Sequence, residues 1–138
     1  MNYAETTELR VGEVMHAGVI TCSSDASLEH VAELMAVHRI HCVVVEGDND
    51  ATWGIVSDLD LAAMFAAGEL EGSAGSSAVT PALTVSPDET LRRAAQRMAE
   101  HGVTHLVVAD PMSLEPVGVL STLDLAEVVA AVAAVSTR

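Results

Sequence analysis

The chain has 138 residues, half of them apolar, and a formal charge of −14 because 20 acidic residues face only six basic ones. This length suits about one compact domain with a core of its own. A surface so poor in Lys and Arg repels phosphate backbones, which argues against DNA or RNA as a direct ligand. Because Trp, Tyr and Phe occur once each, the core must be built from aliphatic side chains and Met.

Nothing in the hydropathy pattern predicts a membrane segment. The longest apolar run, VVAAVAAV at residues 128–135, is far shorter than the ~20 residues that span a bilayer. The first ten residues, MNYAETTELR, lack the basic and apolar regions of a secretory signal. We therefore expect a soluble, cytoplasmic protein. Cys22 and Cys42 show no metal-binding spacing, and we expect them to be buried free thiols because reducing compartments disfavour disulfides.

The first half of the chain predicts a β-α-β-β-α unit at residues 11–66, after an N-terminal tail at residues 1–10. A short strand (GVITC) leads into a helix within SSDASLEHVAELMAVH, whose apolar residues recur with a 3.6-residue period. A buried strand (HCVVVE), a polar turn and a third strand (WGIVS) follow. An Ala- and Leu-rich helix closes the unit.

The second half repeats this order at residues 78–135, after a Gly- and Ser-rich stretch at residues 67–77 that reads as a linker. The helix of this copy is predicted to begin at Ser86. Ser86 would be its N-cap, Pro87 would take the first helical position, and Glu89 would complete a capping box.

The two halves are copies of one unit. At a shift of 63, residues 21–39 and 84–102 are identical at eight positions, and at a shift of 64, residues 41–62 and 105–126 are identical at nine. The expected fold class is therefore α/β (α+β), with two tandem units stacked through their sheets and helices outside.

The most specific repeated phrase is GIVSDLD in the first copy and GVLSTLD in the second. One interpretation is structural: Ser-x-x-Asp has capping-box spacing, and the glycine would relieve a tight turn. The other is chemical. A strand that ends in a helix N-terminus offers free N–H groups to a phosphate, a Ser hydroxyl adds a donor, and an Asp one turn later accepts the two hydroxyls of a ribose.

This arrangement resembles a tandem pair of CBS domains (a Bateman module), here as a stand-alone protein, over roughly residues 11–134. The resemblance implies a regulatory module that senses AMP, ADP, ATP, NAD or S-adenosylmethionine between its two units and signals to a partner protein. The sequence shows no acid/base pair with a nucleophile and no P-loop, so we expect no catalytic residue and no enzymatic activity. We also expect no metal site and no required cofactor. The nucleotide-binding residues that the resemblance implies are Thr21, Ile40, His41, Ser57 and Asp60 for one site, and Thr84, Thr104, His105, Ser121 and Asp124 for the other.

Charge favours some ligands of this class over others. Only one basic residue, Arg39, lies near the expected site, so a polyphosphate gains little from counter-charges there. We expect AMP, or a neutral or cationic adenosyl ligand such as S-adenosylmethionine, to bind better than ATP.

Two other functions stay open from the sequence. Ser-x-x-Asp could be only a helix cap in a ligand-free structural or dimerisation domain, or the two Cys and the His residues could serve a small metal or redox protein. The closing helices carry more Ala and Val than two units can bury, which predicts a homodimer.

Overall fold

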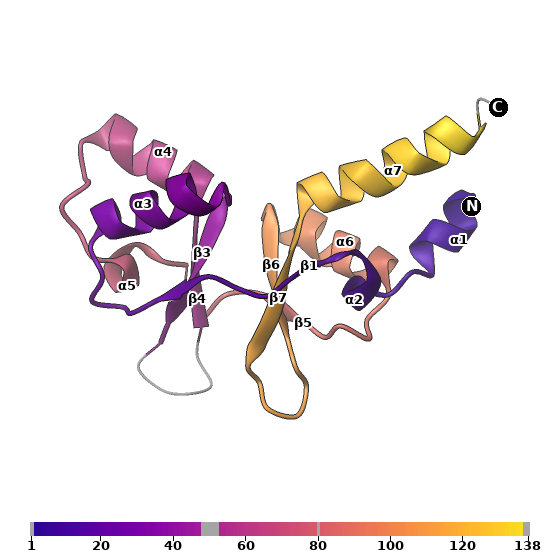
Figure 1. Ribbon diagram of the computed structural model, residues 1–138, viewed down its shortest axis with the longest axis horizontal. Coiled ribbons are helices and arrows are strands. Elements are labelled where there is room, and N and C mark those ends of the chain that lie inside the picture. The colour runs from indigo at the N-terminus through magenta and orange to yellow at the C-terminus, as the bar shows by residue number, and fades with distance from the viewer. Residues whose placement is uncertain (1, 48–52, 80, 137–138) are drawn as a thin grey trace. The chain divides into compact units, whose positions relative to one another are not determined.

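The computed structural model describes residues 2–47, 53–79 and 81–136 (Figure 1). Its helices are α1 (Tyr3–Thr7), α2 (Val11–Val14), α3 (Leu28–His38), α4 (Asp58–Ala67), α5 (Ala74–Ser77), α6 (Leu91–His101) and α7 (Thr122–Ser136). Its strands are β1 (His16–Ala17), β2 (Thr21–Cys22), β3 (Cys42–Glu46), β4 (Trp53–Ser57), β5 (Thr84–Val85), β6 (His105–Ala109) and β7 (Pro116–Ser121). The predicted mixture of sheets and helices is confirmed.

The chain forms two compact units. The first, here called the Asp124 unit, combines Met1–Gly18 with Leu83–Arg138, and the second, the Asp60 unit, is Val19–Ala82. Each unit holds one sheet together with the helices that pack on it, and each is described separately below.

The Asp60 unit is built on a three-stranded sheet in the order β2-β3-β4, with β2 parallel and β4 antiparallel to β3. The apolar run of β3 is buried because both of its neighbours are strands and helix α3 covers one face. Helix α3 buries residues three to four positions apart, as its periodicity predicts. The core cluster consists of Cys22, Val31, Met35, Val43, Val45, Val56 and Ala74.

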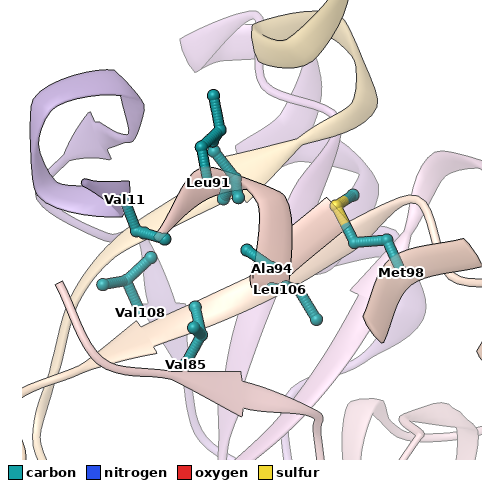
Figure 2. Packing of buried hydrophobic residues seen from close by; sticks show 8 residues of the cluster. Val11, Val85, Leu91, Ala94, Met98, Leu106 and Val108 are labelled. Atoms are coloured by element: carbon teal, nitrogen blue, oxygen red, sulfur yellow. The ribbon is translucent and has the colours of Figure 1, made fainter. Parts of the chain in front are cut away.

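The Asp124 unit has a four-stranded sheet in the order β1-β7-β6-β5. Strands β5 and β6 are parallel, and the other two pairs are antiparallel. Helix α6 supplies three buried side chains to the core, which Figure 2 shows from close by. The core cluster consists of Val11, Val85, Leu91, Ala94, Met98, Leu106, Val108 and Leu120.

Each unit includes the short helix that precedes the first strand of the other sequence copy: α2 lies in the Asp124 unit and α5 in the Asp60 unit. In the Asp124 unit, the N–H of Val11 donates to the carbonyl of Glu89 over 2.9 Å, and the side chain of Val11 is fully buried. In the Asp60 unit, the N–H of Ala74 donates to the carbonyl of Ala26 over 2.7 Å, and Ala74 is fully buried too. Both pairs of positions are related by the shift of 63, so the exchange is reciprocal.

The compact units therefore do not coincide with the two sequence copies. Residues 11–18, expected in the first unit, pack in the Asp124 unit, and the expected linker at 67–77 contains helix α5 of the Asp60 unit. Gly and Ser serve close packing there: a Cβ on Gly75 would lie 2.8 Å from the Cβ of Ser24. The expected N-terminal tail forms helix α1, whose capping box joins Asn2 and Glu5.

The predicted start of the second copy's long helix is wrong by one turn. Helix α6 begins at Leu91, and its N-cap is Thr90, whose Oγ1 accepts a hydrogen bond from the N–H of Arg93 over 3.2 Å. Ser86 instead accepts a hydrogen bond from the N–H of Asp88 within a turn. In this turn, the carbonyls of Pro87 and Glu89 accept hydrogen bonds from the N–H groups of the segment that begins at Val11. This pairing keeps the turn out of the helix.

Candidate functional site

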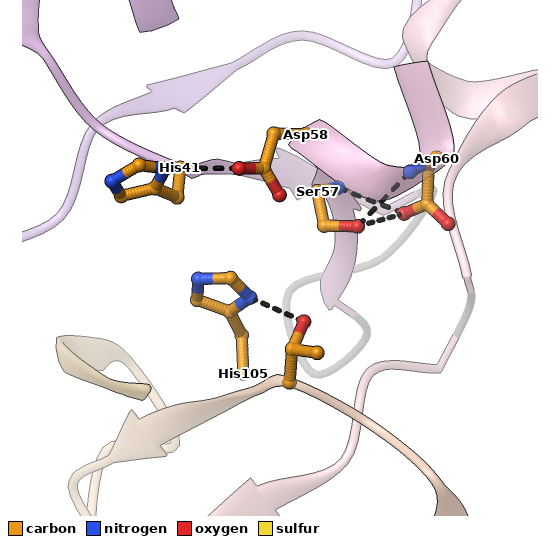
Figure 3. A network of polar contacts seen from close by, with 6 residues as sticks. His41, Ser57, Asp58, Asp60 and His105 are labelled. Carbon is orange, nitrogen blue, oxygen red and sulfur yellow. Dashed lines mark hydrogen bonds and ion pairs between the residues drawn. The ribbon is translucent and has the colours of Figure 1, made fainter. Parts of the chain in front are cut away.

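The first Ser-x-x-Asp pair stands where strand β4 runs into helix α4 without a loop. The N–H and the Oγ of Ser57 donate to Oδ2 of Asp60 over 2.8 and 2.9 Å, and the N–H of Asp60 donates back to Oγ of Ser57 over 3.2 Å (Figure 3). The capping box predicted from the spacing is confirmed. All of these bonds to the carboxylate end on Oδ2, so among the described residues Oδ1 of the partly buried Asp60 is left for a donor from outside the helix.

His41 lies beside the same helix start. Its carbonyl accepts the N–H of Asp58 over 2.8 Å, and its Nδ1 lies 2.9 Å from Oδ2 of Asp58 (Figure 3). The register of strands β3 and β4, which pairs Cys42 with Ser57, explains why His41 meets the first turn of α4. Sequence reasoning missed Asp58, although its place directly after Ser57 was a signal.

The second pair repeats the cap in the Asp124 unit, between strand β7 and helix α7. The N–H of Ser121 donates to Oδ2 of Asp124 over 2.8 Å, and the N–H of Asp124 donates to Oγ of Ser121 over 3.2 Å. His105 is the register partner of Ser121 in the β6–β7 ladder.

Thr104 joins this second group through two contacts. Its Oγ1 shares a hydrogen bond of 2.9 Å with Nδ1 of His105, which is labelled in Figure 3. The carbonyl of Thr104 accepts the N–H of Thr122 over 3.0 Å. The structure thus brings Thr104 and His105 to the start of α7, as it brings His41 to the start of α4. The two helix starts differ in charge, because the hydroxyl of Thr122 stands where the first copy has the carboxylate of Asp58.

Asp124 differs from Asp60 in its surroundings. It is only 2% exposed, and its Oδ1 lies 2.8 Å from Nδ1 of His16, whose side chain is 72% exposed. The contact has the distance of an ion pair, but within the described residues the buried Oδ1 of Asp124 accepts no hydrogen bond. Sequence reasoning found no ligand spacing for His16 and missed this contact.

Gly118 of the repeated phrase allows strand β1 to pack close to strand β7, which places His16 next to Asp124. Strand β1 pairs His16 with Val119 and Ala17 with Gly118. A Cβ on Gly118 would lie 2.6 Å from the carbonyl oxygen of His16 and 2.6 Å from Sδ of Met15. The expectation that this glycine relieves a tight turn is wrong: it lies inside strand β7 and permits a close approach of two backbones.

The remaining expected site residues lie farther from the Ser and Asp side chains. Thr21 and Thr84 are exposed, on strands β2 and β5, each separated from the serine-bearing strand by one intervening strand. The carbonyl of Thr84 accepts a hydrogen bond from the Arg97 guanidinium. Ile40 is half-buried and packs against the core of the Asp60 unit.

The two cysteines are buried free thiols, as the sequence predicts. Burial, with the nearby charge of Asp58 as a second cause, raises the pKa of Cys42 to about 12. Burial also raises the pKa of Cys22. Protonated thiols are poor nucleophiles and metal ligands, which weighs against a redox or metal function. Within residues 2–47, 53–79 and 81–136, no three His, Cys, Asp or Glu side chains cluster closely enough to hold a metal ion.

Two further features of the described residues bear on function. A surface cavity of about 530 Å³ lies in the Asp60 unit and contains none of the expected site residues. It is lined by Met64, Gly68, Glu69, Glu71, Gly72, Ser76 and Ser77. Each described helix is too short or too polar for a transmembrane span.

Comparison with known proteins identifies the fold and the repeat. The chain is 29% identical over 118 residues to the CBS domain-containing protein YhcV of Bacillus subtilis (strain 168), a match that covers 84% of this chain and 82% of YhcV. The CBS domain protein PAE2072 of Pyrobaculum aerophilum, solved in complex with AMP, is 27% identical. It superposes with a TM-score of 0.76 over 91% of this chain and 98% of its own.

A third relative supports the fold alone, and a family model covers most of the sequence. The CBS domain pair of MJ0100, solved with 5′-methylthioadenosine and S-adenosyl-L-methionine, has a TM-score of 0.79 at 19% identity, over 88% of this chain and 96% of its own. The model of the CBS domain matches residues 11–67 and again residues 76–131. The chain therefore belongs to the CBS domain family and carries two copies of the domain.

Proposed function

We propose that this protein is a regulatory module that binds an adenosine-containing nucleotide, with AMP favoured, and signals its occupancy to a partner protein. The observation that carries the proposal is the Ser-x-x-Asp helix start, present in both units. In the Asp60 unit, capping uses only Oδ2 of Asp60, so Oδ1 can accept a ribose hydroxyl while the first turn of α4 faces a phosphate. The AMP complex of PAE2072 supports this ligand class.

The charges at the two helix starts support the preference for a ligand with little negative charge. Helix α4 has two carboxylates in its first turn, Asp58 and Asp60, whereas α7 has only Asp124. Each added phosphate on the ligand meets this negative field. AMP or S-adenosylmethionine should therefore bind better than ADP, ATP or NAD. Calorimetry that finds ATP binding more tightly than AMP without Mg²⁺ would contradict this preference.

The competing function is a ligand-free structural domain, in which the Ser-x-x-Asp pairs only cap their helices. A thermal-shift panel of AMP, ADP, ATP, NAD, S-adenosylmethionine and Zn²⁺ separates the two functions. A ligand at ~100 times its Kd adds about 2.7 kcal/mol of stability, which moves a melting point by several degrees. If no nucleotide shifts the wild-type protein, the proposed function is wrong and the structural one stands. A shift by Zn²⁺ alone would favour the metal-binding alternative.

Variants test the residues assigned to the site. Asp60→Asn and Asp124→Asn keep the shape of each cap but remove the charge that would hold a ribose diol. Asp25→Asn, an exposed carboxylate outside both caps, is the matched control. The double variant should lose the nucleotide shift while the control keeps it. A double variant that responds like the wild type would show that the nucleotide binds elsewhere.

We further propose that the protein is a homodimer formed through its closing helices. Helix α4 exposes Leu59 and Phe65, and helix α7 exposes Leu123 and Val129. These are the same two positions of the repeat, related by the shift of 64. Large apolar side chains exposed twice at matching positions suit an interface with a second copy.

A further inference from the structure

We propose that His16 lowers the nucleotide affinity of the Asp124 site, because its imidazole lies against the Asp124 carboxylate. The nucleotide would then bind first and most tightly at Asp60. The inference rests on the proposed function and deepens it, because it names the residue that sets the order in which the two sites fill.

The contact that carries the inference lies wholly within the Asp124 unit. Nδ1 of His16 stands 2.8 Å from Oδ1 of Asp124, and Oδ2 of the same carboxylate accepts the N–H of Ser121. Oδ2 of Asp124 is therefore used by the cap, and the imidazole lies against Oδ1, which accepts no hydrogen bond from the described residues. With the residue 2% exposed, a ribose hydroxyl reaches Oδ1 only if the imidazole moves away.

The backbone of His16 is fixed by strand pairing, whereas its side chain has room to rotate. Its main chain is paired in the β1–β7 ladder and lies against Gly118, which keeps the backbone of His16 beside strand β7. Its side chain is 72% exposed, so rotation of the imidazole into solvent is sterically open. The imidazole thus competes with a ligand for Asp124 without blocking it permanently.

The repeat provides an internal comparison at Asp60. The shift of 63 relates His16 to Val79, and the backbone contacts agree: His16 pairs with Val119, and Val79 pairs with Ile55, the repeat counterpart of Val119. Valine has no nitrogen to offer a carboxylate. Among the described residues, the carboxylate of Asp60 accordingly accepts hydrogen bonds from Ser57 alone, and no imidazole competes for its Oδ1.

The test measures AMP binding by calorimetry on four proteins that each keep one site. Asp60→Asn leaves only the Asp124 site, and adding His16→Val gives that site the residue found in the other copy. Asp124→Asn leaves only the Asp60 site, and adding Val79→His gives that site an imidazole. The His16→Val substitution should tighten AMP binding at the Asp124 site about tenfold, and the Val79→His substitution should weaken AMP binding at the Asp60 site.

The outcomes separate this inference from the proposed function. Should His16→Val leave the affinity of the Asp60→Asn protein unchanged, His16 does not compete with the ligand and the inference is wrong. Equal AMP affinities of the Asp60→Asn and Asp124→Asn proteins would also overturn it, although nucleotide binding would stand. If the wild type and all variants fail to bind AMP while circular dichroism shows them folded, both the proposed function and the inference fall.

Discussion

At the scale of single residues, a Ser-x-x-Asp pair can cap its helix with one carboxylate oxygen and bind a ligand with the other. In the first copy the capping hydrogen bonds end on Oδ2 of Asp60 and Oδ1 remains for a ligand, so a structural cap and a ribose contact do not exclude each other. In the second copy the same cap is present, yet His16 faces the remaining oxygen of Asp124. The shared Ser-x-x-Asp spacing therefore does not make the two sites equal.

The thiol of Cys42 makes the free energy of unfolding depend on pH in the alkaline range. Its pKa is raised to about 12 in the folded protein, against 9.0 as its ordinary value, so the unfolded chain loses this proton first. The contribution to stability is complete below about pH 9 and is lost as the pH rises toward 12. Between about pH 8 and about pH 10, the free energy of unfolding should fall by about 1 kcal/mol more in the wild type than in Cys42→Ala. Equal losses in urea titrations of both proteins would refute this.

Sequence reasoning at this scale succeeded where the relevant partners are close in the chain. The spacing of Ser57 and Asp60 defines a capping box whatever the rest of the fold does. The partner of Asp124, by contrast, is far away in the chain, and only the pairing of β1 with β7 brings His16 to it. No local pattern encodes such a contact.

At the scale of elements, the exchange of first segments between the sequence copies organises both units. Helix periods and strand runs were predictable, because burial imposes them on each element alone. The segment at residues 67–77 has the Gly- and Ser-rich composition that is typical of linkers. Ala74 is nonetheless fully buried, and Gly75 is small so that two backbones can approach. Composition cannot distinguish close packing from flexibility.

Gly118 tests the close approach of strand β1 directly. In Gly118→Ala the new Cβ would meet the backbone oxygen of His16 at 2.6 Å, so strand β1 must shift. The variant should lose about 1–3 kcal/mol in urea unfolding.

Gly72→Ala is the matched control for this substitution. Its nearest neighbours are side-chain oxygens, with Oγ of Ser76 at 3.1 Å, and a Ser side chain can rotate away. We expect Gly72→Ala to be distinctly milder than Gly118→Ala. If both variants cost the same, the packing of β1 against Gly118 does not matter for stability.

At the scale of the whole molecule, the exposed apolar positions of helices α4 and α7 predict self-association. Phe65 is 76% exposed on α4. Phe65→Glu should shift the sedimenting species from a dimer toward the 14.3 kDa monomer, because a charge buried without a partner is costly. Met112→Glu is the control, since Met112 is 91% exposed and lies in the turn between β6 and β7, outside helices α4 and α7. A wild-type protein that sediments as a monomer would contradict the dimer.

The central claim is that the carboxylate at a strand-to-helix junction holds a nucleotide, and calorimetry with AMP on the wild type and on Asp60→Asn tests it most directly. We predict saturable AMP binding to the wild type and an affinity at least about tenfold lower for Asp60→Asn, with Asp25→Asn unchanged. An Asp60→Asn protein that binds AMP as tightly as the wild type, or a wild type that binds none, would contradict the claim.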